Sequence, residues 1–358
     1  MGRLEGVART AGTRYPAPVV RPPRSRALRL LASLLLAAGL FGYFLHRAPL
    51  AEVLATVARV DAANLLLAVA AALLSYALRA IRWGLLLRPA GRAPTLQLLG
   101  ATAAGFATST IFPARAGELV RPLLLASQAR LPAAATLASI LTERLVDLAS
   151  VLALFAVGVA LSRHTLLTSA LPALVRAAAL AAAALLTGIA LLALLLRHPE
   201  GVTRTLLSWV PARFRERARS FLQHLLDGLG AVKDPRTLGA VGLASACVWL
   251  PVCFQIQLTG RAFGQTFPLS TTFVVLGVSV LGLAVPTPAG VGGFHAAVQF
   301  ALTALLGVDL KTATAFALVH HGVCFFPITV IGLAYLGATG AALGEAPSGS
   351  RTGPPGGT

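Results

Sequence analysis

Charged residues are scarce in this sequence, and acidic residues are the scarcest. Only 12% of its 358 residues are charged, with 30 Lys and Arg against 12 Asp and Glu. A soluble domain carries about 25% charged residues, so this composition excludes an ordinary soluble fold. The alternating segments that build a membrane β-barrel are also absent, which leaves helices as the way to cross a bilayer.

Cysteine is rare as well, and Cys247, Cys253 and Cys324 are the whole set. All three lie in apolar segments, and their spacing differs from that of metal-binding motifs. Cysteines in such segments serve as small apolar packing residues. We therefore expect no metal site and no cofactor.

Long apolar runs are abundant, since 56% of the residues are hydrophobic. A hydrocarbon core of about 30 Å needs about 20 helical residues to cross it. The sequence therefore predicts an all-α polytopic membrane protein with six full spans, near residues 27–45, 62–80, 132–161, 172–196, 238–260 and 312–338. The first apolar run follows several arginines, as in a signal peptide. However, Phe41, Tyr43 and His46 stand where a signal peptide has the small residues of its cleavage site, so we expect an uncleaved first span.

Polar segments set the domain organisation. We expect a disordered basic N-terminus over residues 1–26, one transmembrane domain over 27–340 and a disordered tail over 341–358. Residues 197–236 form the long polar connection, in which apolar side chains repeat at helical spacing. This pattern is typical of an amphipathic helix at the membrane surface, where an anchoring role is the simplest interpretation.

The net charge of +18 comes from arginines that lie between the apolar runs. Their position indicates membrane topology and contact with anionic lipid headgroups, and it argues against a nucleic-acid partner. Basic segments stay on the cytoplasmic side, so residues 1–26 and 197–236 should both be inside. We expect an inner-membrane protein with both termini cytoplasmic.

Two apolar segments, 95–130 and 269–306, would then begin and end on the same side of the membrane. We predict that each is a re-entrant helix pair and that the two pairs enter from opposite faces. Their turns, Pro113–Glu118 and Pro286–Gly293, share the pattern Pro-x-x-Ala-Gly. Broken helices at equivalent positions are typical of an inverted repeat with a binding site near the midplane.

Charged residues cluster around the first turn and in the following span: Arg115, Glu118, Arg121, Glu143, Arg144 and Asp147. An unpaired charge at mid-bilayer costs about 2.5–3.5 kcal/mol, so these groups must pair or line a wet cavity. Helical spacing allows the pairs Glu118–Arg121 and Arg144–Asp147. One interpretation is an ion-pair network that holds the broken helix; the other is a site where arginines bind a lipid phosphate.

The second turn contains Gly290, Gly292 and Gly293, with His295 at the start of the next helix. Glycines let backbone N–H groups face an anion, although they also serve close helix packing. His295, His320 and His321 lack nearby carboxylates, so a role in protonation linked to transport is favoured over a metal site. Arg79, Arg82, Trp83 and Arg88 follow the second span and are interpreted as an interfacial anchor.

Several motifs in this order resemble the lysylphosphatidylglycerol synthase transmembrane-region family, also called flippase-like proteins. They are Arg82-Trp83, Pro-x-Arg-x-Gly-Glu-x-x-Arg at Pro113–Arg121, Glu143-Arg144 with Asp147, and Pro-x-Pro-x-Gly-x-x-Gly at Pro286–Gly293. The resemblance covers about residues 27–340 and implies a cytoplasmic-membrane protein that translocates or handles polar lipids. The family often has Glu where this chain has His295. The aminoacyl-transfer domain of the full-length synthases is not expected in this chain.

The leading hypothesis is a flippase or transporter for a lipid with a phosphate-bearing head. Arg115 and Arg121 would bind the phosphate, while Glu118, Glu143 and Asp147 would hold the arginines or bind a cationic head. A membrane enzyme that uses Glu118 or Glu143 as a base remains an alternative, as does a non-catalytic scaffold. Lipid identity, transport direction, energy source and oligomeric state stay open.

Overall fold

The computed structural model describes residue 35 and residues 50–112, 115–162, 171–232, 234–285 and 287–339. Apart from Leu35, the predicted first span lies outside these residues, as do both predicted disordered termini and Pro113, Ala114 and Pro286 of the turns. Helices make up 86% of the described residues, and this part of the chain contains no strand. The all-α class is therefore confirmed.

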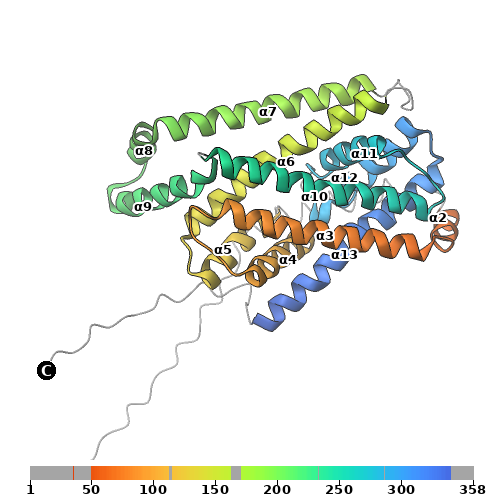
Figure 1. Cartoon of the computed structure of the whole chain (residues 1–358), viewed down its shortest axis with the longest axis horizontal. Helices are drawn as coiled ribbons and strands as arrows, with labels where there is room; N and C mark the ends of the chain where they lie inside the picture. The colour runs from red at the N-terminus through yellow and green to blue at the C-terminus, as the bar shows by residue number, and fades with distance from the viewer. Residues whose placement is uncertain are drawn as a thin grey trace, which may run out of the picture.

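The described chain forms helices joined by short connections (Figure 1). In chain order they are α2 Leu50–Val57, α3 Ala62–Leu86, α4 Thr95–Ile111, α5 Gly117–Ala129, α6 Ala133–Ser162, α7 Leu171–Arg197, α8 Pro199–Ser208, α9 Ala212–Gly228, η2 Leu229–Val232, α10 Pro235–Ala262, α11 Leu269–Gly282, η3 Pro288–Gly290, α12 Gly293–Phe300, the π-helical η4 Ala301–Leu305 and α13 Leu310–Thr339.

Five of these helices are long and apolar enough to cross a membrane. They are Ala62–Leu86, Ala133–Ser162, Pro172–Arg197, Pro235–Ala262 and Leu310–Thr339, and they coincide with the second to sixth predicted spans. The second span was predicted too short, because α3 continues beyond Ala80 to Leu86. A continuous helix satisfies its own backbone groups, so a run of this length and composition is stable in lipid.

The helices α3 and α10 lie antiparallel and pack along most of their length. The N–H of Asp61, at the start of α3, donates to the carbonyl oxygen of Ala262, at the end of α10, over 3.1 Å. Midway, the Ser75 hydroxyl donates to the carbonyl of Val248 at 3.1 Å. Because the two helices run in opposite directions, the segments that follow them start at opposite ends of the molecule.

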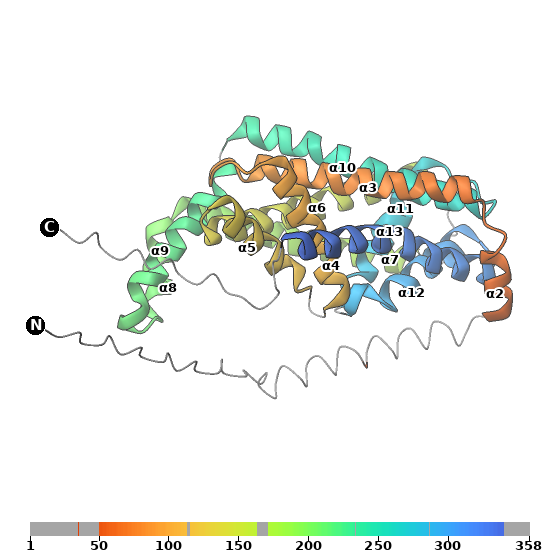
Figure 2. The same cartoon turned by 90° about the horizontal axis from the view of Figure 1, so that it is seen from below.

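Each of these segments is a helical hairpin, α4–α5 after α3 and α11–α12 after α10. Figures 1 and 2 show α4–α5 toward the end that carries α8 and α9, and α11–α12 toward the end that carries α2. Glycines allow the hairpin arms to touch: a Cβ on Gly117 would overlap the carbonyl oxygen of Gly105, and one on Gly293 would lie 2.6 Å from that of Gly282.

The two halves also pack on each other in a reciprocal way. Helix α4 packs against α13, and α11, its counterpart in the second half, packs against α6. Glycines lie at both contacts, because Gly332 of α13 faces Ala103 of α4 while Gly158 of α6 faces Phe273 of α11. Small residues let helix backbones approach closely, which is a main source of helix association in lipid.

Helix α7 lies on the outside of the bundle (Figure 1). Only 6% of the residues in the most apolar stretch of α7 are buried by the rest of the protein, and the helix contacts α6. The predicted amphipathic connection is helical, as α8, α9 and η2. Helix α9 packs back on α6, so the connection is held at one end of the bundle.

Candidate functional site

Two arginines on the same face of α3 meet an acid of α6. Arg82 Nη1 lies 2.7 Å from Asp147 Oδ1, and Arg79 Nη1 lies 3.2 Å from Asp147 Oδ2. Arg82 is completely buried, and Arg79 and Asp147 are nearly so. Arg82 also donates to the hydroxyl of Ser245 on α10 at 3.1 Å. Helix α3 thus carries the cations that α6 neutralises, and α10 adds a hydroxyl acceptor.

Glu143, one turn before Asp147 on α6, also contacts three arginines. Its Oε1 lies 2.9 Å from Arg121 Nη1, 3.4 Å from Arg82 Nη2 and 3.4 Å from Arg144 Nη2. Arg121 comes from α5, the return arm of the first hairpin, and is 3% exposed. Glu143 therefore joins the broken helix to both α3 and α6 within the protein interior.

The outer edge of the cluster is open to solvent. Arg144 pairs with Asp147 at 3.6 Å and approaches Glu118 at 4.0 Å, while Glu118 pairs with Arg115 at 3.6 Å. These three outer side chains, Arg115, Glu118 and Arg144, are 48%, 36% and 36% exposed. The network thus runs without a break from a dry interior to an accessible edge at the first turn.

The predicted Arg144–Asp147 pair is confirmed, but the predicted Glu118–Arg121 pair is wrong. Arg121 turns inward to Glu143, and Glu118 turns outward to Arg115 and Arg144. A fully buried carboxylate is a stronger partner for a buried guanidinium than a half-exposed one, because water screens the exposed charge. Spacing along one helix could not reveal this competition from another helix.

Positive charge exceeds negative charge in this network. Five arginines, Arg79, Arg82, Arg115, Arg121 and Arg144, face three carboxylates, Glu118, Glu143 and Asp147, which leaves an excess of two positive charges. Among the described residues, Arg121 Nε and Nη2, Arg82 Nε and also Glu143 Oε2 are buried without a hydrogen-bond partner. Guanidinium N–H groups in a fixed fork suit the oxygens of a phosphate or carboxylate. The network therefore holds more guanidinium charge than its own carboxylates neutralise.

Tryptophan side chains cover two of these arginines. The guanidinium of Arg121 lies 4.1 Å from the ring centroid of Trp83, and that of Arg79 lies 4.4 Å from the centroid of Trp249. Trp83 Nε1 donates to the Ser139 hydroxyl at 2.9 Å, which fixes the ring. Arginine over an aromatic face is stabilised by the ring quadrupole, most strongly where water is excluded.

These contacts correct the interpretation of Arg79, Arg82 and Trp83 as an interfacial anchor. Arg82 and Trp83 are 0% exposed and belong to the core of the charged cluster. Only Arg88 of that group is exposed. The predicted cluster already balanced the three arginines Arg115, Arg121 and Arg144 against three acids, so no unmet charge in the sequence pointed to Arg79 and Arg82.

The residues of the second turn form a separate group. Ala289, Gly290 and Gly292 adopt positive φ values of 53°, 69° and 86°. The N–H of Gly292 contacts His295 Nδ1 at 3.3 Å, and His321 Nε2 lies 3.0 Å from the carbonyl oxygen of Ala289. The turn is thus held by histidines from α12 and α13, and Gly293 begins α12.

A histidine and cysteine cluster lies beneath this turn. The rings of His295 and His321 have centroids 4.5 Å apart, and Cys324 Sγ lies 3.8 Å from His320 Nε2. His320, His321 and Cys324 each follow Glu143, Arg144 and Asp147 by 177 residues, so the neutral cluster is the counterpart of the charged one. Among the described residues no group of three or more His, Cys, Asp or Glu is arranged to hold a metal ion.

The two turns touch through Arg115. Its Nη2 donates to the backbone carbonyl of Leu283, the C-cap of α11 just before the second turn, and α4 also packs against η3 of that turn. Arg115 itself has φ 52°, so both turns pass through a left-handed residue. The structure therefore gathers all predicted site residues into two adjoining groups: the charged one, Arg115, Glu118, Arg121, Glu143, Arg144 and Asp147, and the neutral one, Gly290, Gly292, Gly293, His295 and His320.

Long apolar helices around a charged interior define a multi-pass helical membrane protein with a polar centre. Residues 30–332 match the family described as the lysylphosphatidylglycerol synthase TM region. The chain belongs to this family, as the motifs predicted. Comparison with the curated proteins gives no match.

Proposed function

We propose that this protein moves a phospholipid, or another lipid with a phosphate-bearing head, between the leaflets of the inner membrane. The observation that carries the proposal is the excess of positive charge beside the first hairpin turn: two charges over the whole network, and one among its buried members Arg79, Arg82, Arg121, Glu143 and Asp147. Burying a charge without a partner is costly, and a lipid phosphate is the anion most available inside a membrane. Family membership supports the same class of function.

In this proposal, the hairpins α4–α5 and α11–α12 are re-entrant and enter the bilayer from opposite faces. The antiparallel helices α3 and α10, and the reciprocal packing of α4 on α13 and of α11 on α6, support an inverted repeat of two four-helix units. Together with the first span at 27–45, the architecture would contain six full spans. Both termini would be cytoplasmic, on the side of α8 and α9.

Within that frame, Arg115 and Arg144 first meet the lipid head at the exposed edge, and Arg121 then receives the phosphate. Glu118, Glu143 and Asp147 hold the arginines in place between substrates. Gly290, Gly292 and Gly293 let the second turn approach the head closely, while His295 and His320 line the neutral side of the path. The chain's own groups thus replace part of the hydration of the phosphate during passage.

Leaflet transfer of fluorescent phospholipid in proteoliposomes tests the proposal. Arg121→Gln should slow transfer by about ten- to a hundredfold, which corresponds to the loss of one charge-assisted hydrogen bond. Arg88→Gln is the matched control, because it removes the same charge from an exposed position at the end of α3.

A double variant, Arg121→Gln with Glu143→Gln, separates binding from folding. It removes both members of a buried ion pair, so the interior keeps its charge balance and its fold. We expect this variant to fold stably but to transfer phospholipid more slowly than the wild type. Transfer at the wild-type rate in the double variant would show that Arg121 serves only to neutralise Glu143, and the proposal would fail.

A further inference from the structure

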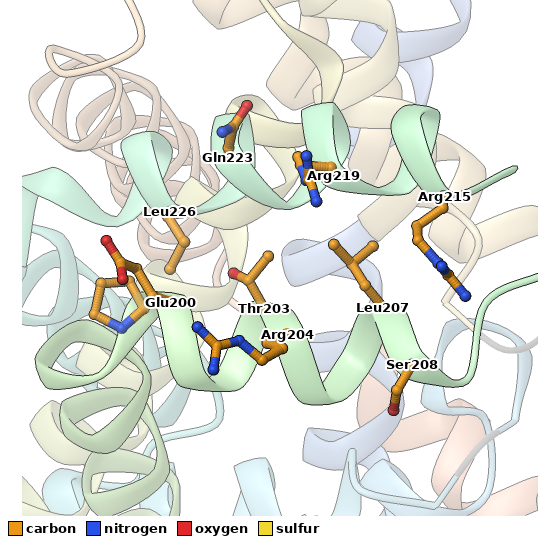
Figure 3. A pocket seen from close by; sticks show the side chains of 10 residues that line it. Glu200, Thr203, Arg204, Leu207, Ser208, Arg215, Arg219, Gln223 and Leu226 are labelled. Carbon is orange, nitrogen blue, oxygen red and sulfur yellow. The ribbon is translucent and has the colours of Figure 1, made fainter. Parts of the chain in front are cut away.

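A groove lies between α8 and α9, far along the chain from the charged cluster. It has a volume of about 800 Å³ and opens to solvent on one side. Figure 3 shows side chains from both helices lining it, with Thr203 and Leu207 of α8 opposite Arg219 of α9. Leu207 and Leu226 give the groove an apolar base, and Arg204, Arg215 and Arg219 give it a basic rim.

Connectivity fixes this groove at the membrane surface. Helix α8 starts two residues after the end of the candidate span Pro172–Arg197, and the candidate span Pro235–Ala262 starts three residues after η2. The α8–α9 unit is therefore tied to two membrane spans at the same end of the molecule, as Figure 1 shows. A groove in this place is within reach of lipid headgroups of one leaflet.

The charge of the unit suits an anionic partner. Residues 197–232 contain six arginines and three acids, which leaves an excess of three positive charges. Within the described ranges neither Arg204 nor Arg215 has a carboxylate within ion-pair distance, whereas Arg219 pairs with Glu216 at 3.8 Å. Glu200 is the single acid that lines the groove. Arginines of this kind near a bilayer attract anionic headgroups strongly.

Exposed aromatic side chains on the same unit indicate that the partner is a lipid surface. Trp209, in the loop that joins α8 to α9, is 86% exposed, and Phe214 and Phe221 on α9 are 44% and 48% exposed. Tryptophan is enriched at headgroup level, because its ring has an apolar body and a polar N–H. An amphipathic unit with aromatic and arginine side chains lies in the interfacial plane of a membrane.

We propose that the α8–α9 groove binds the phosphate of an anionic phospholipid from the adjoining leaflet, through Arg204 and Arg215. This site is separate from the charged cluster around Glu143 and does not depend on lipid transfer by the protein. Its occupant stays at the surface, with its acyl chains in the bilayer beside α7. Trp209 directly follows Ser208, which lines the groove, so its indole can report on a lipid bound there.

The fluorescence of Trp209 provides a local test. The chain has three tryptophans, and Trp83 and Trp249 are buried. The full protein is placed in nanodiscs of phosphatidylcholine that contain a minor fraction of lipid brominated near the top of its acyl chains. That fraction is either phosphatidylglycerol or phosphatidylcholine, and a Trp209→Phe variant supplies the background to subtract.

Brominated phosphatidylglycerol should quench Trp209 more than brominated phosphatidylcholine. Each arginine that binds a headgroup should enrich phosphatidylglycerol near the groove about fivefold over the bulk membrane. In the variant Arg204→Gln/Arg215→Gln, the two brominated lipids should quench the fluorescence of Trp209 equally. The control Arg213→Gln/Arg217→Gln removes the same charge from side chains that do not line the groove, and it should keep the preference. Equal quenching by both lipids in the wild type, or equal loss of preference in both variants, would overturn the proposal.

Discussion

Arg115 of the first hairpin turn donates a hydrogen bond to the backbone carbonyl of Leu283, at the end of α11 just before the second turn. This bond joins the two breaks in the helical core, which come from segments 168 residues apart in the chain. The same arginine pairs with Glu118 at 3.6 Å, and Glu118 leads through Arg144 to the buried acids. Arg115 therefore couples the charged group of site residues to the neutral one.

Removing this coupling should loosen the second turn. In Arg115→Gln, backbone amides of residues 283–293 are expected to exchange faster with deuterium, because the turn loses an external hydrogen bond that limits its opening. Arg130→Gln is the control: Arg130 is also an arginine with positive φ, at the end of α5. Unchanged exchange in Arg115→Gln would mean that the α4–η3 packing alone holds the turns together.

Arg82 should be essential for stability, in contrast to its neighbour Arg88. Arg82→Gln leaves Glu143 and Asp147 with fewer buried cations, and breaking such a pair costs about 3–5 kcal/mol. The melting temperature in nanodiscs should fall markedly, whereas Arg88→Gln should melt close to the wild type because Arg88 is exposed. Equal melting temperatures for the two variants would contradict the buried pairing of Arg82 and support a role as a surface anchor.

Close helix contact at Gly332 should tolerate no added methyl group. A Cβ there would overlap the carbonyl oxygen of Ala103, so Gly332→Ala must push α13 away from α4. Overpacking of this kind costs about 1–3 kcal/mol. Gly322 lies on the same helix with nothing within 4 Å of an added Cβ, so Gly322→Ala is the matched control. Thermal unfolding should separate the two, and similar curves would contradict the packing described.

Asp234, the N-cap of α10, should make stability depend on pH at acidic values. Hydrogen bonds from the Thr237 hydroxyl and from the N–H groups of Thr237 and Arg236 lower the pKa of Asp234 below its usual 3.8. A carboxylate with a lowered pKa stabilises the fold above its unfolded pKa and loses this effect as pH falls through the folded value. Asp234→Asn should therefore flatten the decline in stability below about pH 4, measured by thermal unfolding across pH.

Five of the six predicted spans and the helix breaks could be predicted from sequence because they follow from local chemistry. Apolar runs of bilayer length leave the backbone only the helical option, and the two Pro-x-x-Ala-Gly motifs mark where the helical runs are interrupted. The pairing of charges depended on tertiary neighbours instead. Spacing placed Arg121 near Glu118, but Glu143 of the next helix binds it at 2.9 Å.

Arg79 and Arg82 show the same limit at the level of a span. A cation near the end of an apolar run is typical of a headgroup anchor, and the helix was predicted to stop near Ala80. In the structure α3 continues to Leu86, and Asp147 meets Arg82 at 2.7 Å. Whether such an arginine faces lipid or core is decided by a partner on another helix, which a single run of sequence does not reveal.

The central claim is that the excess positive charge beside the first turn serves a phosphate that passes through the protein. The most direct measurement compares leaflet transfer of two fluorescent lipids with identical acyl chains in the same proteoliposomes, one with a phosphate in its head and one with an uncharged sugar. The account predicts that the protein accelerates the phosphate-bearing lipid well beyond the sugar lipid. Equal acceleration of both, or of neither, would contradict it.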